Sequence, residues 1–205
     1  DNFTELYGGT TSALGFKSEG TNFTGSLLIG HSTTGTISSA EQNTGIGIGA
    51  LDALTSGDAN VALGYNAGTS INSGSSNITI GFASGDAIST GSNNVAIGRN
   101  SLTTEDTGSD AVAIGRGALQ NQNYNGSSYN VAVGRDAGLS VTTGTNNVLM
   151  GAFAGDALTT GVYNVAIGRS ALSLEDENGY NVAVGAFALL NQNAGADAHN
   201  VAVGY

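Results

Sequence analysis

The basic residues of this chain are few, and most of them occupy one position of a recurring word. The 205 residues include five Lys and Arg, and four of these directly follow the Gly of a Val-Ala-Ile-Gly-like word: Arg99, Arg116, Arg135 and Arg169. If successive words stack at the spacing of β-strands, these cations lie about 5 Å apart and need carboxylates or an anionic ligand nearby. Two interpretations are open. Arg99, Arg116 and Arg135 contact an anionic glycan or a partner chain, or they form salt bridges with acids of neighbouring coils or subunits.

A second candidate surface is the amide-rich segment "NQNYNGSSYN", which begins at Asn121. A protruding loop of this composition suits contact with carbohydrate through Asn121, Asn123, Tyr124 and Tyr129. A variable loop without a binding role is the alternative.

Four Asn-x-Ser/Thr sequons are candidates for N-glycosylation in a secreted protein. They begin at Asn2, Asn22, Asn77 and Asn125. In a chain this rich in Ser, Thr and Asn, chance alone produces several such sequons, so they favour secretion only weakly.

The acidic residues gather in turns, as at Glu105-Asp106 and Glu175-Asp176-Glu177. Calcium needs about six to eight oxygen ligands, and no Gly-Gly-x-Gly-x-Asp word is present, so we expect solvated acidic loops without a metal or a cofactor. The two His residues are distant in the sequence, there is no Cys, and the acids lack a surrounding aromatic cleft of the kind that glycoside cleavage uses. We therefore predict no enzymatic activity.

The overall composition narrows the class of protein further. Sixteen acids against five bases give a net charge of −11, which argues against nucleic acid and against an anionic membrane surface as partners. No apolar run approaches the ~20 residues of a membrane-spanning helix. The chain has 33 Gly and no Pro. The absence of Pro is typical of long parallel β-ladders, because Pro cannot donate a backbone hydrogen bond to them.

A repeat organises the whole sequence. The anchoring Gly residues of the words are Gly15, Gly30, Gly49, Gly64, Gly81, Gly98, Gly115, Gly134, Gly151, Gly168, Gly185 and Gly204. From Gly64 the steps run 17, 17, 17 and 19 residues, twice, which gives a super-repeat of seventy residues. Such a period predicts a parallel β-solenoid, or β-roll, of about twelve coils of 15–19 residues, with a length of about 55 Å.

Each word reads as a short strand whose side chains alternate between two faces. In the word at Val95 we expect the β-branched Val95 and Ile97 to line the core and Ala96 to face outward. Apolar residues later in each coil, such as Leu102 or Ile71, should fill the opposite wall. An Asn precedes eight of the last nine strands, from Asn60 to Asn200, and predicts a ladder of stacked amides.

The small residue at the centre of each strand suggests close packing there, against another wall of the same chain or against another chain. The self-association candidates are Ala62, Ala96, Ala113, Ala132, Ala166, Ala183 and Ala202. The ends are a further candidate: joining Tyr205 of one copy to Asp1 of the next would give an anchor step of 1 + 15 = 16 residues, which suits a head-to-tail filament.

The chain divides into irregular N-terminal coils (1–59), two four-coil blocks (60–129 and 130–199) and the start of a further coil (200–205). All four form one continuous solenoid in this interpretation.

The words "NVAIGRNS" at Asn94 and "NVAIGRSA" at Asn164 resemble the head repeats of trimeric autotransporter adhesins and the related repeats of phage and viral tail fibres. This resemblance implies an oligomeric β-roll, homotrimeric in that family, on a cell or virion surface outside the cell. It implies a structural fibre or filament subunit, or alternatively an adhesin head that contacts surface glycans. The expected partners are further copies of the chain and, for an adhesin, cell-surface carbohydrate.

Overall fold

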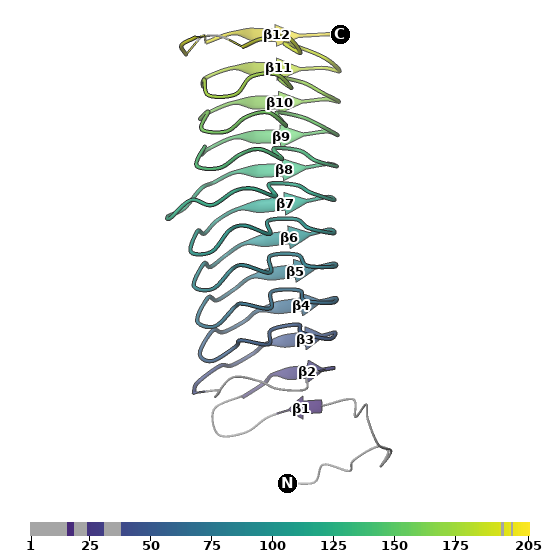
Figure 1. Cartoon of the computed structure of the whole chain (residues 1–205), viewed down its shortest axis with the longest axis vertical. Helices are drawn as coiled ribbons and strands as arrows, with labels where there is room; N and C mark the ends of the chain where they lie inside the picture. The colour runs from purple at the N-terminus through teal and green to yellow at the C-terminus, as the bar shows by residue number, and fades with distance from the viewer. Residues whose placement is uncertain (1–15, 19–23, 31–37, 194, 198) are drawn as a thin grey trace.

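The structure is a computed structural model, and it describes residues 16–18, 24–30, 38–193, 195–197 and 199–205. These residues form an all-β rod in which one short strand per coil is stacked on the next (Figure 1). The strands are β1 (Phe16–Ser18), β2 (Leu27–Ile29), β3 (Thr44–Ile46), β4 (Val61–Leu63), β5 (Ile78–Ile80), β6 (Val95–Ile97), β7 (Val112–Ile114), β8 (Val131–Val133), β9 (Val148–Met150), β10 (Val165–Ile167), β11 (Val182–Val184) and β12 (Val201–Val203).

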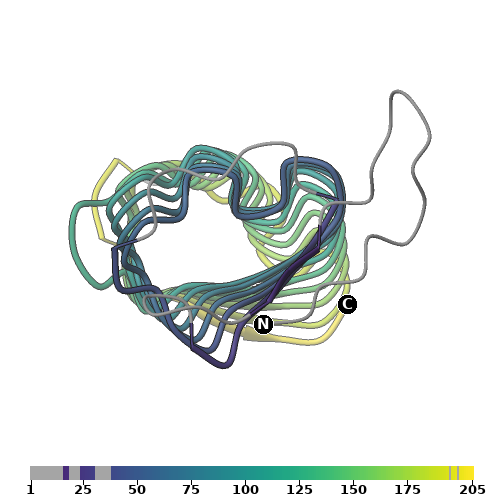
Figure 2. The same cartoon turned by 90° about the horizontal axis from the view of Figure 1, so that it is seen from below.

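The sheet confirms the predicted parallel β-solenoid. Strands β2 to β12 pair in sequence order and in parallel, so that Val95 lies beside Val112 and Ile97 beside Ile114. Viewed along the rod, the coils superpose around one narrow interior (Figure 2). The described residues contain eleven parallel strands, because β1 pairs antiparallel with β2. The twelfth predicted word, which ends at Gly15, lies outside the described residues.

The register corrects one predicted anchor. Ile29 pairs with Ile46, and Ile46 with Leu63. The Gly that follows β3 is therefore Gly47 rather than Gly49, and the steps from Gly30 to Gly64 are both 17 residues. The sequence "GIGIG" offers two Gly residues two positions apart, so that alternation by itself cannot choose between them. Packing does choose: a Cβ on Gly47 would meet the backbone oxygen of Gly64 at 2.4 Å.

The two faces of the strands are inverted relative to the prediction. Ala96 is fully buried, whereas Val95 and Ile97 are only partly covered and face outward. The opposite wall explains the inversion. The predicted plugs Leu102, Leu119, Ile71 and Ile88 do point inward and are fully buried, and they fill the narrow interior. The strand can then contribute only a small side chain.

Exceptions to the small-residue rule support this explanation. Leu149 stands at an Ala position and is fully buried. The opposite wall makes room for it, because a Cβ on Gly138 or Gly155 would approach Leu149 side-chain carbons to 2.7 Å. The large Leu149 is thus accommodated by Gly on the opposite wall, as close packing requires.

Candidate functional site

The outward face of β2–β12 is an apolar surface in which Thr44 of β3 is the one polar outward residue. None of the residues of these strands is charged, and each strand directs two side chains outward. Their exposed fractions are 37% at Val61, 45% at Leu63 and 38% at Ile167, and rise to 78% at Val203 of the edge strand β12. Solvated sheet faces ordinarily carry polar residues, so this surface resembles one that is covered by a partner.

The small residues predicted to form that surface do not. Ala62, Ala96, Ala113, Ala132, Ala166 and Ala183 are buried inside their own chain. Ala202 has the same orientation and is half-covered, because β12 has a neighbour on one side only. Of the two alternatives left open by the sequence, packing against another wall of the same chain is the one that the structure shows for these alanines.

The predicted head-to-tail contact concerns the two ends of the rod, and these present different edges. Tyr205 is 97% exposed beside the edge strand β12. At the other end, however, the edge of β2 is occupied by β1 in the antiparallel direction, so the parallel ladder does not continue there. Asp1 lies outside the described residues.

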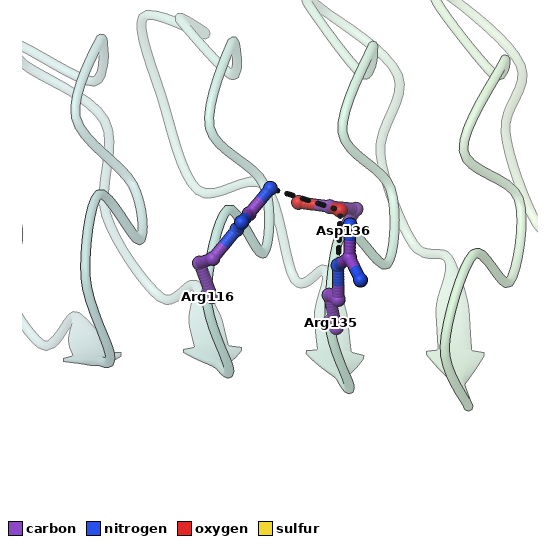
Figure 3. A network of polar contacts seen from close by, with 3 residues as sticks. All are labelled: Arg116, Arg135 and Asp136. Carbon is purple, nitrogen blue, oxygen red and sulfur yellow. Dashed lines mark hydrogen bonds and ion pairs between the residues drawn. The ribbon is translucent and has the colours of Figure 1, made fainter.

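The arginines lie in a column immediately after the bend that ends each strand, and we call this column the downstream edge. Along β4–β12 it runs through Tyr65, Phe82, Arg99, Arg116, Arg135, Ala152, Arg169, Ala186 and Tyr205. Figure 3 shows Arg116 and Arg135 from neighbouring coils converging on Asp136. The Arg116 Nη2–Asp136 Oδ2 distance is 3.6 Å, and the Arg135 Nε–Asp136 Oδ2 distance is 3.0 Å. The predicted salt bridge to an acid of a neighbouring coil is thus present at Arg116, whereas Arg135 pairs with the next residue of its own coil.

Aromatic rings support the other cations of the downstream edge. The Arg99 guanidinium lies 5.8 Å from the Phe82 ring centre, and the Arg169 guanidinium lies 5.4 Å from that of Phe187. Phe82 in turn stacks on Tyr65 at 5.3 Å. Within the described part of the chain, Arg99 and Arg169 have no carboxylate partner, so their charge is available to another molecule.

A second column, which we call the upstream edge, borders the other end of the strands. It consists of the residue two positions before each of the strands β4–β12: Ala59, Ser76, Asn93, Asp110, Tyr129, Asn146, Tyr163, Tyr180 and His199. All nine have a positive φ, between 51° and 62°. This common conformation turns each coil into its strand. Tyr163, Tyr180 and His199 form a continuous stack with ring centres 5.2 and 5.0 Å apart.

Between the edges, the predicted Asn ladder is confirmed. The Asn147 side chain donates to the Gly161 carbonyl at 2.8 Å, and its oxygen accepts from the Asn164 backbone N–H at 2.9 Å. The same pair of bonds recurs at Asn60 and Asn77. Each amide therefore ties a turn to the next coil, and the ladder has a structural role.

The acidic turns correct another expectation. Glu105 is fully buried rather than solvated. Its carboxylate accepts from the Gly108 N–H and from the Gln122 side chain, both at 2.9 Å. Gln122 also accepts from Asn130 at 2.8 Å. Among the strands β4–β12, only β7 is preceded by Ala (Ala111) instead of Asn, and in that coil the Gln122 side chain supplies the oxygen to which the next ladder residue, Asn130, donates.

Three of the four residues predicted to contact carbohydrate lie in the protruding loop, and the fourth, Tyr129, lies outside it. Asn121 and Asn123 are exposed and Tyr124 is half-covered in the protruding coil between β7 and β8 (Figure 1). Tyr129 is 59% exposed, but it belongs to the upstream edge, at the entrance to β8.

Of the four sequons, one is excluded by the fold. Asn77 is fully buried, and its amide is a ladder member, so the folded chain has no room for a glycan there. Asn125 is exposed. Asn2 and Asn22 lie outside the described residues.

Sequence reasoning found the arginine column of the downstream edge, but it missed the upstream edge and the outward apolar face. The available signal was positional: no strand from β2 to β12 has a charged residue, and polar or aromatic residues recur immediately before the Asn. Among the described residues, no three His, Asp, Glu or Cys side chains gather in a way that could hold a metal ion. The described part of the chain also has no helix with the length and hydrophobicity to cross a membrane.

Fold and surfaces together define a β-solenoid repeat protein with one apolar outer sheet face. Comparison with models of protein families, with curated proteins and with solved structures finds no match for this chain.

Proposed function

We propose that this protein is a structural subunit of an extracellular fibre, and that it associates laterally with copies of itself through the outward face of β2–β12. The observation that carries the proposal is the apolar surface that runs along β2–β12 and is broken at one outward position, Thr44 of β3. Eleven strands present two side chains each. With the exposed fractions given above, they offer on the order of 1,000 Å² of apolar area, more than the largest patch on a typical monomer and enough for a stable interface.

The shape of the rod supports the same role. The described residues present no catalytic cluster around this surface, and the face repeats from coil to coil as a fibre shaft would require. The resemblance of the sequence words to adhesin-head and tail-fibre repeats implies three copies of the chain around a common axis.

The test is the mass of the purified chain in solution, measured by light scattering over a range of concentrations. We expect an assembly of several chains, and electron microscopy should show rods thicker than one solenoid. Ile114→Glu, in the middle of the outward face, should yield monomers. Thr143→Glu adds the same charge on an exposed turn away from that face and should leave the assembly intact. A monomeric wild-type chain would overturn the proposal.

A second function, contact with surface glycans, is favoured by the exposed amides of Asn121 and Asn123 in a coil two residues longer than most. If the glycan is anionic, the guanidinium groups of Arg99 and Arg169, which have no carboxylate partner among the described residues, would attract it. Glycan-array binding that is lost in Asn123→Ala, with the assembly mass unchanged, would support this alternative. Absence of binding to any glycan would reject it.

A further inference from the structure

The two edges of the outward face are complementary to each other, but they lie too far apart to meet within one chain. Asp110 and Arg116 flank β7 and are six residues apart along an extended segment, roughly 15–20 Å. We propose that the downstream edge of one copy pairs with the upstream edge of a second copy, coil against equivalent coil. The copies are then parallel and in register. This inference rests on the proposed self-association and specifies its geometry.

Symmetry explains why these edges would meet. A cyclic assembly whose axis runs along the rod involves no shift along that axis, so equivalent coils of all copies lie at the same height. When the outward faces turn toward the axis, the end of a strand in one copy comes next to the beginning of the equivalent strand in its neighbour. Each contact between edges is therefore between two residues of the same coil number.

Charge is the first observation in favour. Four coils carry Arg on the downstream edge, and their upstream residues are, in order, Asn93, Asp110, Tyr129 and Tyr163. An amide oxygen, a carboxylate and the faces of two aromatic rings are all groups that bind a guanidinium. The arginines retain charge to offer: Arg116 and Arg135 share the single carboxylate of Asp136, and their side chains are 58% and 57% exposed.

Size is the second and independent observation. Where the downstream residue is a large aromatic, Tyr65 or Phe82, the upstream residue of the same coil is small: Ala59 or Ser76. The reverse holds where the downstream residue is Ala. Ala152 and Ala186 belong to the coils whose upstream residues are Asn146 and Tyr180. The bulk of the two edges thus compensates in these four coils, as residues in contact require, although nothing within one chain brings them together. The coil of β12, with His199 and Tyr205, and the coil of β3, with Gln42 and Ile48 at the equivalent positions, each carry two large residues instead.

The absence of Cys from the sequence allows a direct test by crosslinking. In the full chain, Asp110→Cys with Arg116→Cys should oxidise to a covalent species that contains every copy of the assembly, because each contact joins one Cys of each kind. A disulfide needs Cα atoms within about 7 Å, so a bond within one chain is excluded. Asp110→Cys with Arg169→Cys is the matched control. It would require a slip of three coils, about 14 Å, and should stay uncrosslinked.

Charge exchange gives the second readout. Asp110→Arg alone and Arg116→Asp alone should each weaken the assembly about tenfold or more, because like charges then face each other across the contact. The double exchange should return the assembly constant to within about threefold of the wild type. The loss of the contacts that each side chain makes within its own chain persists in the double variant, so recovery reports the contact between chains alone.

The outcomes separate the two proposals. A wild-type chain that is monomeric overturns both. A wild-type assembly whose Asp110→Cys, Arg116→Cys variant remains uncrosslinked overturns this pairing and leaves lateral self-association standing. Crosslinking by Arg116→Cys alone would also overturn it, because that bond requires the downstream edges of two copies to meet each other.

Discussion

Removing one rung of the amide ladder should destabilise the rod by an amount that the structure allows us to estimate. We choose Asn147→Ala, because Asn147 is fully buried in the middle of the solenoid. The substitution leaves two backbone groups without partners: the Gly161 carbonyl, now bonded at 2.8 Å, and the Asn164 N–H, now bonded at 2.9 Å. Each unpaired buried group costs about 1–3 kcal/mol, so we expect a loss of about 4 kcal/mol in the free energy of unfolding.

The chain itself shows what compensation would look like. At Ala111 the ladder lacks its Asn, but Gln122 supplies an oxygen that accepts from the Asn130 side chain at 2.8 Å. The residue that corresponds to Gln122 in the coil of Asn147 is Leu158, which is apolar and fully buried. No side chain there can replace the lost amide, and the full cost should therefore appear.

The assay is denaturant unfolding together with hydrogen exchange of the Asn164 amide. Solenoids need not unfold in one step, so the exchange rate reports the local loss and denaturation reports the global one. Thr143→Ala, on an exposed turn of the preceding coil, is the control and should change stability by less than about 0.5 kcal/mol. If Asn147→Ala proves as mild as this control, the ladder does not carry the stability that we assign to it.

Three further predictions address other features. Gln122→Ala should lower the denaturation midpoint more than Gln192→Ala, because Gln122 is fully buried while Gln192 is partly exposed; equal effects would contradict this. Gly98→Ala should unfold the rod at lower denaturant than Gly204→Ala. Both positions have positive φ, but only at Gly98 would the Cβ meet backbone, at 2.5 Å; similar midpoints would show that close stacking is not the constraint. Burial raises the pKa of Asp86 above 3.8. Its protonated form is therefore favoured on folding, and the stability present below pH 3.8 is lost as pH rises through the raised pKa. Asp86→Asn should stabilise the chain at pH 7 and not at pH 3, as measured by thermal unfolding; an equal gain at both values would refute this.

The sequence by itself determined the coil, its period and its internal ladder. A 17-residue step with Gly after a three-residue, mostly β-branched word favours parallel stacking of the words. An Asn directly before each strand, as at Asn60 and Asn147, then lies beside the equivalent Asn of the next coil and can bond to that coil's backbone. The plugs Leu102 and Ile71 were predictable for the same reason, since one coil cannot bury its apolar residues alone.

Only the tertiary structure decided which strand face points inward. Alternation shows that Val95 and Ile97 share a face and that Ala96 takes the other, but it does not say which face is the core. The volume supplied by the opposite wall settles that question: Leu102 and its equivalents fill the interior, and Ala96 is all that still fits. The same wall buries Glu105 and directs the β-branched residues outward. The apolar outer face follows from packing across the coil, which is a relation between distant residues that local pattern does not contain.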